Sequence, residues 1–204
     1  MGKKVKCLGI CLLLAATVWA GNLLRDRQYL DRELIRLHVV AASDSDTDQS
    51  VKLQVRDAIV ASLSEGMAGI GDVEAAKNYI RENLPKIEAV ANRTLNACGV
   101  DSRAVATLRE EAFDTRRYDT FSLPAGVYES LRVVIGEGQG KNWWCVAFPS
   151  LCLAATSEAF ESTAQTSGMD DGLSRTLSGE PEYQLRFYLL DVLGRVENFC
   201  FSGK

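Results

Sequence analysis

The stretch that decides the fold is Leu34-Ile35-Arg36-Leu37-His38-Val39-Val40, because a polar turn and a helical pattern follow it directly. The odd-numbered residues from Ile35 to Val39 are apolar, whereas Arg36 and His38 alternate with them. Alternation with a period of two, in a segment rich in β-branched residues, is typical of a strand with one buried face. We therefore expect a strand here, with its apolar residues toward the core.

A helix is expected to follow this strand. In the polar turn Ala42–Gln49, Asp46 and Gln49 have the spacing of a capping box, which satisfies the first free amides of a helix. Apolar residues then recur at helical spacing, at Val51, Val55, Ile59 and Leu63. The acidic residues of the turn resemble the start of a calcium loop, but the required glycine and the bidentate glutamate are missing. We interpret these acids as groups that complement the helix dipole.

A second helical pattern begins after the capping residue Asp72. Pro85 predicts a kink or a break within it, because proline removes a hydrogen bond of the helix. Gly99 is expected to end this helix, because glycine readily adopts the left-handed backbone conformation. The two patterns together predict a helical layer over about residues 46–98.

After Gly99 the pattern changes to short β-branched runs bounded by turn residues. The expected strands are residues 104–110, 127–135, 142–148 and 183–190. The glycine-rich turn 136–140 separates two of these runs, so a hairpin is the simplest connection. Residues 156–182 are rich in Ser, Thr, Gly and Asp and predict a long flexible loop. The predicted fold class is α+β, a helical layer packed on a mostly antiparallel sheet, in a single domain over residues 33–204.

The first residues of the chain have the pattern of an export segment. Three lysines precede an uncharged, mostly apolar run from Cys7 to Ala20, and signal peptidase cleavage after Ala20 fits the small residues there. The apolar character continues to Leu24, and the run then approaches the roughly 17–25 residues that a spanning helix needs. Residues 1–24 are therefore expected to be a signal peptide or an uncleaved membrane anchor. In both cases the lysines keep the N-terminus in the cytoplasm and place the domain outside it.

Composition narrows the range of partners and cofactors. The 204 residues are 47% hydrophobic and 25% charged, with a formal net charge of -4, which is typical of a globular domain. No run of Lys and Arg occurs beyond the first six residues, so nucleic acid is not an expected partner. His38 is the one histidine, which excludes a His-rich metal site within one chain, and the sequence predicts no metal and no cofactor.

Four cysteines remain after the export segment, at positions 98, 145, 152 and 200. An oxidising compartment favours pairing, and four cysteines allow three complete connectivities. The neighbours Cys145 and Cys152 are the favoured pair, since closing their short loop stabilises the fold by about 2.5 kcal/mol. Whether Cys98 and Cys200 pair or remain buried free thiols is left open by the sequence.

Two segments invite a catalytic interpretation. The run Gly136–Lys141 fits neither a Walker loop nor a dinucleotide-binding loop, because the glycine spacing is wrong and a strand follows where a helix is needed. Ser43 lies five residues after His38, with several aspartates nearby, so a secreted hydrolase that uses His38, Ser43 and an aspartate is one hypothesis. No Gly-x-Ser-x-Gly element and no Asp-Ser/Thr-Gly element supports it. We therefore expect a protein that is not an enzyme.

The segment Asn142-Trp143-Trp144-Cys145 is the most unusual of the chain. Adjacent residues of a strand face opposite sides of a sheet, so one tryptophan can lie in the core while the other faces a partner. Tryptophan is enriched in binding hot spots, although a strand buried on both faces would give the same composition. We expect a partner-binding surface made from this segment and the preceding polar turn, with the residues Ser43, Asp44, Asp48, Asn142, Trp143 and Trp144.

Two blocks of the sequence together resemble the stage II sporulation protein R family of endospore-forming bacteria. The first runs from Ile35 to Ser45 and continues through Asp48-Gln49 to Asp57. The second runs from Pro124 to Cys152 and contains the highly specific Asn-Trp-Trp-Cys sequence. The resemblance covers about residues 1–152. Asp114 and Ser150 depart from it, since relatives tend to carry proline at these places.

The resemblance implies a secreted, non-enzymatic signal made in the forespore and exported into the space between the forespore and mother-cell membranes. There it would activate, by non-covalent binding, a membrane-embedded aspartic protease that processes the sigma-E precursor. This protease is the expected partner, and the N-terminal segment would contact the membrane if it is uncleaved. The hydrolase that uses His38 and Ser43 remains the alternative, and an envelope structural protein is a third, weaker possibility.

Overall fold

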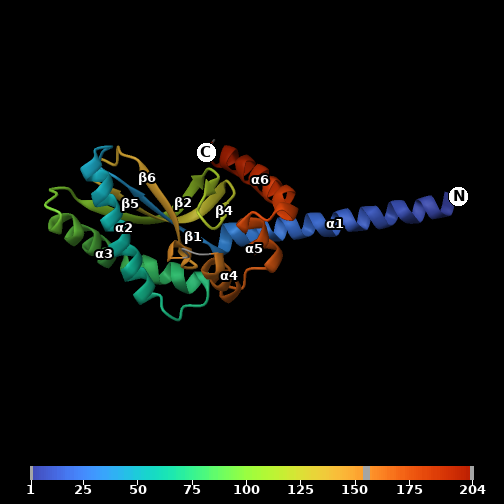
Figure 1. Ribbon diagram of the computed structural model, residues 1–204, viewed down its shortest axis with the longest axis horizontal. Helices are drawn as coiled ribbons and strands as arrows, with labels where there is room; N and C mark the ends of the chain where they lie inside the picture. The colour runs from blue at the N-terminus through green and yellow to red at the C-terminus, as the bar shows by residue number, and fades with distance from the viewer. Residues whose placement is uncertain (1, 154–156, 203–204) are drawn as a thin grey trace.

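The computed structural model describes residues 2–153 and 157–202 (Figure 1). The helices are α1 (Gly2–Glu33), α2 (Asp46–Gly66), α3 (Val73–Ala97), α4 (Ser157–Thr166), α5 (Asp171–Ser178) and α6 (Gln184–Ser202), with short 3₁₀ turns at Leu151–Leu153 and Pro181–Tyr183. The strands are β1 (Ile35–Val40), β2 (Ala104–Phe113), β3 (Arg116–Arg117), β4 (Ser122–Leu123), β5 (Gly126–Ile135) and β6 (Asn142–Phe148). The chain therefore has the α+β fold that its sequence predicts.

The main sheet has the strand order β2-β5-β1-β6, and β3 pairs with β4 in a second, small sheet. β1 runs parallel to β5 and antiparallel to β6, and β2 is antiparallel to β5. The expected hairpin between β5 and β6 is wrong, because β1 lies between them. All six residues of β1 are buried, and a strand covered on both faces is favoured in the centre of a sheet.

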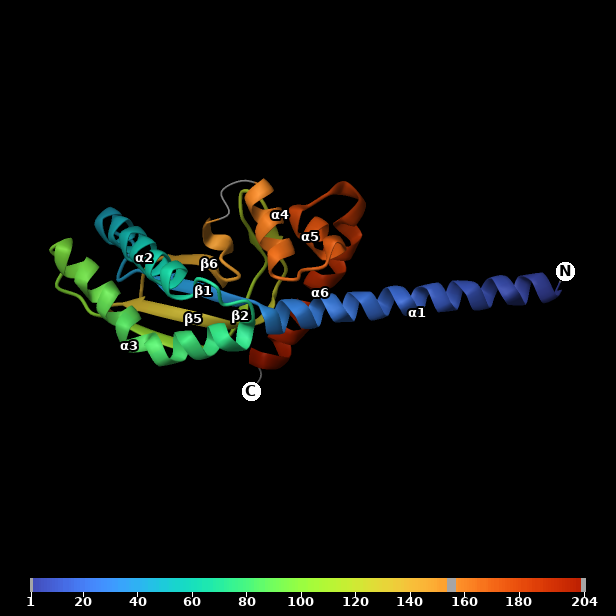
Figure 2. The same ribbon diagram turned by 90° about the horizontal axis from the view of Figure 1, so that it is seen from below.

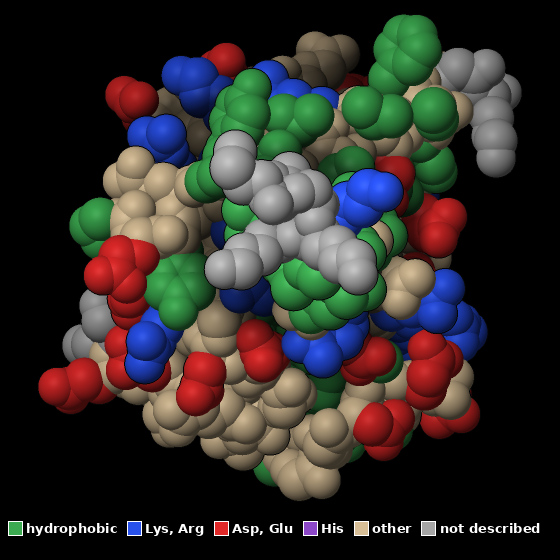
Figure 3. Space-filling view, turned by 90° about the vertical axis from the view of Figure 1, so that its right-hand side faces the viewer, with side chains coloured by type: hydrophobic (Ala, Val, Ile, Leu, Met, Phe, Trp, Pro, Cys, Tyr) green, Lys and Arg blue, Asp and Glu red, His purple; other side chains and the backbone are tan. Residues whose placement is uncertain are grey.

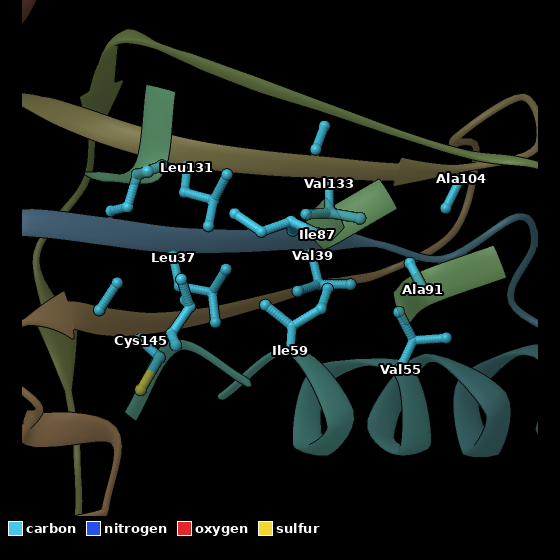
Figure 4. Close-up of a cluster of buried hydrophobic side chains, with 14 of the residues drawn as sticks. Leu37, Val39, Val55, Ile59, Ile87, Ala91, Ala104, Leu131, Val133 and Cys145 are labelled. Carbon is cyan, nitrogen blue, oxygen red and sulfur yellow. The ribbon is translucent and has the colours of Figure 1, made fainter. Parts of the chain in front are cut away.

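Helices α2 and α3 cover one face of the sheet (Figure 2). Leu37 and Val39 of β1 meet Ile59 of α2 and Ile87 of α3 in the core between the layers (Figure 4). This arrangement confirms the predicted helical layer. Helix α3 runs without a break through Pro85, which is exposed, so water can satisfy the carbonyl group that proline leaves free.

The expected loop 156–182 is wrong, because most of it forms helices α4 and α5; residue 156 lies outside the described residues. Asp170 caps α5 by accepting hydrogen bonds from the amides of residues 172 and 173, and Gly179 ends the helix in the left-handed conformation. Phe160 and Leu173 are buried from these two helices. Few aliphatic residues suffice here, since Ala164, Leu173 and Leu177 all lie on the buried face.

The expected strand over residues 183–190 is also wrong, because α6 begins at Gln184 and continues to Ser202. The buried residues of α6 are Leu190, Asp191 and Gly194, which lie on one helical face. Helix α6 covers the second face of the sheet together with α4, α5 and the end of α1 (Figures 1 and 2). The sheet is therefore enclosed by helices on both faces.

Helix α1 projects away from the domain (Figure 1). Its residues 6–22 are exposed, whereas Leu23 and Leu30 pack into the core of the second layer. The helix is long and apolar enough to cross a membrane, and a signal sequence has the same properties. The exposed part is the apolar run that the sequence assigns to an export segment or an anchor.

Candidate functional site

The polar turn after β1 folds around the side chain of Ser43. The Ser43 hydroxyl donates to the Asp48 carboxylate at 2.5 Å, and the side-chain Nε2 of Gln49 donates to the Ser43 carbonyl oxygen at 2.8 Å. Ser45 is the N-cap of α2, and its hydroxyl accepts from the Asp48 amide at 3.1 Å. The predicted capping box at Asp46 and Gln49 is therefore displaced by one residue, because Gln49 bonds to the backbone of the turn instead.

Replacing Ser45 with alanine is expected to destabilise the domain by about 1 kcal/mol, because the Asp48 amide at the start of α2 loses its acceptor. Urea denaturation of the purified chain measures this change. Ser50 is an exposed residue inside the same helix, and alanine there is expected to change stability by less than about 0.5 kcal/mol. Equal losses at the two positions would show that the hydroxyl of Ser45 does not cap the helix.

The glycine-rich turn between β5 and β6 closes over the turn after β1. The Lys141 amide donates to the Asp44 carboxylate at 2.6 Å, and the Gly140 amide donates to the Ala41 carbonyl at 3.0 Å. A Cβ atom at Gly140 would overlap the Ser43 carbonyl group and lie 2.9 Å from the Cβ of Ala41. Two segments about a hundred residues apart in the sequence thus approach each other as closely as their backbones allow.

Lys52 joins the start of α2 to the glycine-rich turn between β5 and β6. It is 4% exposed, and its ammonium group donates to the Gln49 side chain at 2.7 Å and to the Lys141 carbonyl at 3.0 Å. Burial lowers the pKa of Lys52, while the nearby Asp44 carboxylate opposes this change. Lys52 was not among the predicted site residues, although a lysine inside the apolar stripe of α2 is a signal in the sequence.

We define the turn surface as residues Ser43–Asp48 together with Lys141 and Asn142. Asp44, Asp46, Lys141 and Asn142 are exposed on it. Four of the six predicted partner-binding residues meet here, namely Ser43, Asp44, Asp48 and Asn142. The surface is polar and mainly acidic, and internal hydrogen bonds hold the Asp44 and Asp48 carboxylates in place.

Trp143 and Trp144 face opposite sides of the sheet, as the sequence predicts. Trp143 packs on the α2 and α3 side, where the Arg56 guanidinium lies 4.2 Å from the centre of its ring. Trp144 stacks on His38 on the other side, with 3.7 Å between ring centres, and Arg116 lies 4.6 Å from its centre. Both tryptophans are half-buried, so each offers a partner only part of its ring.

His38 belongs to a hydrogen-bonded cluster on the second face of the sheet. Its Nδ1 atom lies 3.1 Å from the Glu111 carboxylate, which also pairs with Arg109 at 2.9 Å. Burial raises the pKa of Glu111, but hydrogen bonds from His38 and Arg109 outweigh this effect and lower the pKa to about 2. Glu111 is a residue that the sequence analysis missed, since nothing local indicates that β2 faces His38.

The structure does not bring together the residues of the hydrolase hypothesis. His38 pairs with Glu111, whereas the hydroxyl of Ser43 is bonded to Asp48. No hydrogen bond joins His38 to Ser43 among the described residues. Within residues 2–153 and 157–202, no group of three or more His, Cys, Asp or Glu side chains is placed to hold a metal ion.

Cys145 and Cys152 form a disulfide, with their Cα atoms 5.5 Å apart. The bond ties the end of β6 to the short helical turn at Leu151–Leu153, directly after the tryptophan pair. Cys98 and Cys200 are free thiols; Cys98 is half-buried and Cys200 is exposed. The disulfide and the apolar helix α1 together are features of a secreted or membrane-anchored protein.

Comparison with known proteins places these features in a family. The family model described as stage II sporulation protein R matches residues 31–158, which include the turn surface and both tryptophans. Stage II sporulation protein R of Bacillus subtilis (strain 168) is 38% identical over 120 residues, which are 59% of this chain and 54% of the relative. The chain thus spans about half the length of that relative, and no solved structure matches it. The chain belongs to the stage II sporulation protein R family.

Proposed function

We infer that the protein is an exported sporulation signal that docks, through its turn surface, on a membrane-embedded aspartic protease and thereby activates it. The protease would then process the sigma-E precursor, and the signal would act in the space between the forespore and mother-cell membranes. Family membership supports a role in sporulation. The apolar helix α1 and the disulfide support export.

Activation by binding alone requires a ligand that prefers the active state of its target, because equal affinity for two states shifts neither. A rigid ligand achieves such a preference more readily, since it loses less conformational entropy on binding. The observation that carries the proposal is the joining of the two turns: Asp44 holds the Lys141 amide at 2.6 Å, and the buried Lys52 ammonium bonds to both sides. The exposed Asp44 carboxylate therefore keeps a fixed position from which to meet a basic surface of the protease.

Asn142 offers the sharpest test, because it is exposed and contributes no side-chain hydrogen bond among the described residues. Replacing it with arginine is expected to reduce processing of the sigma-E precursor by about tenfold or more, since a large cation then projects from an acidic docking surface. The assay co-expresses the full chain, the membrane-embedded protease and the precursor, and follows cleavage by immunoblot.

Gln165 on α4 provides the matched control, because it is exposed and α4 lies at the other end of the domain (Figure 1). Q165R is expected to leave processing unchanged. Normal processing with N142R, in a folded and exported protein, would place the docking surface elsewhere. Equal losses for both variants would attribute the effect to added charge rather than to the turn surface.

A further inference from the structure

Helix α6 is covered on one side by the domain and exposes an apolar face on the other. Leu185, Tyr188, Val196 and Phe199 are 63%, 62%, 58% and 83% exposed. Their spacing places them on one side of the helix, opposite the buried residues Leu190, Asp191 and Gly194. Among the described residues outside α1 and α6, the one exposed large hydrophobic residue is Val105, at 49%. An apolar face of this kind marks a surface that another phase or molecule covers.

Ion pairs fix α6 beside the place where the apolar run of α1 ends. Arg186, in the first turn of α6, lies 2.6 Å from Asp26, which follows the apolar run by two residues. Glu197 lies 2.6 Å from Arg27, which is also on α1. Asp26 and Arg27, the two partners on α1, are almost fully buried, so these contacts are part of the packed domain.

The apolar surface of α1 continues onto α6. Leu24, the last residue of the apolar run, is 56% exposed and lines a hollow of about 600 Å³ together with Val196 and Phe201. Charged side chains of both helices, Arg32 and Glu197 among them, line the same hollow. Figure 3 views the molecule from the side of α1 and shows hydrophobic side chains gathered around α1 and above it, over α6. A membrane that surrounds α1 up to Leu24 would therefore meet α6 at once.

We propose that α6 is a second membrane contact: it lies on the outer surface of the bilayer that α1 enters, with its exposed apolar face against the lipid. Amphipathic helices bind in this way when an apolar face meets the boundary between headgroups and acyl chains. Arg25 and Arg195 pair with Asp170 and Asp191 at 3.9 and 2.9 Å, but their side chains are 63% and 68% exposed and can also contact lipid phosphates beside this face. A bilayer is favoured over a second copy of the chain because the face is continuous with α1.

The contact determines the orientation of the domain relative to the membrane. β1 begins at Ile35, next to the end of α1, and the turn surface follows the opposite end of the strand at Val40. A domain held by both α1 and α6 therefore points the turn surface away from its own membrane. The inference about α6 requires that α1 stays attached as an anchor, and it does not depend on the identity of the protease.

Spin labelling of the full chain tests the contact directly. The four free cysteines are replaced with serine, and a nitroxide label is attached to a single new cysteine by L185C, V196C or the control V105C. The protein is reconstituted into vesicles of phosphatidylethanolamine and phosphatidylglycerol in equal parts. Collision rates with oxygen, which concentrates in lipid, are compared with those of a water-soluble nickel chelate.

Membrane contact predicts an oxygen-to-nickel ratio several-fold higher at positions 185 and 196 than at position 105. Water-like ratios at all three positions overturn the proposal. Dipolar coupling between labels, together with low oxygen access, also overturns the proposal if the coupling disappears on dilution with unlabelled protein. A second copy of the chain would then cover the face. Circular dichroism verifies the fold of each labelled chain, and the labelled positions are exposed.

Discussion

Replacing Gly140 with alanine is expected to lower the stability of the domain by about 2–4 kcal/mol and to abolish precursor processing. The reason is the close approach of the two turns: the new Cβ atom would overlap the Ser43 carbonyl group and crowd Ala41. The backbone must then separate, which breaks the bonds from the Gly140 amide to Ala41 and from the Lys141 amide to Asp44. Urea denaturation and the co-expression assay measure the two effects.

Gly71 supplies the control, because a Cβ atom there meets no atom within 4 Å. G71A is expected to leave stability within about 0.5 kcal/mol of the unchanged protein and to retain processing. If G140A is as stable and as active as G71A, the tight contact between the turns has no part in folding or signalling.

Replacing Glu111 with glutamine is expected to destabilise the protein at neutral pH by an amount on the order of 3 kcal/mol. The Glu111 side chain is 13% exposed and pairs with His38 and Arg109, which lower its pKa from 4.5 to about 2. A carboxyl group whose pKa is lower in the folded state stabilises that state at pH values above its pKa in the unfolded chain. This stabilisation is lost as pH falls from about 4.5 to about 2.

The unfolding free energies of the unchanged protein and E111Q, measured by urea denaturation across that pH range, should therefore converge toward pH 2. Glu110 is the matched control, since it is exposed and lies next to Glu111 on β2. E110Q is expected to change stability by less than about 0.5 kcal/mol. A gap between E111Q and the unchanged protein that stays constant with pH would mean that the charge of Glu111 is not the stabilising group.

The sequence predicts the elements of this fold better than their arrangement. β1 is evident because apolar residues alternate along it, and α2 because Val51, Val55, Ile59 and Leu63 recur at helical spacing. The place of β1 between β5 and β6 depends on contacts distant in the sequence, which local patterns do not encode. The first residues of α6 alternate and therefore resemble a strand. Only the burial of Leu190 and Gly194 on one face shows that the segment is a helix.

The candidate site shows the same division. Ser43, Asp44 and Asn142 could be proposed from composition and turn chemistry, and the two tryptophans from strand geometry. The full role of Lys52 could not, because its second partner, the Lys141 carbonyl, lies in a turn that is distant in the sequence. Nor could the pairing of His38 with Glu111, because the sequence offers Ser43 and the nearby aspartates as neighbours of His38. Residue identity indicates the available chemistry, and the topology decides which groups meet.

The central position of β1 also bears on how the chain crosses a membrane. β1 is among the first parts of the domain to be synthesised, yet its two neighbours, β5 and β6, end only at Ile135 and Phe148. The sheet cannot close until both have emerged, because pairing over such sequence separations requires the whole intervening chain. The sheet therefore stays open until Phe148 has been made, and a chain that is exported during synthesis would enter the channel before this sheet could form.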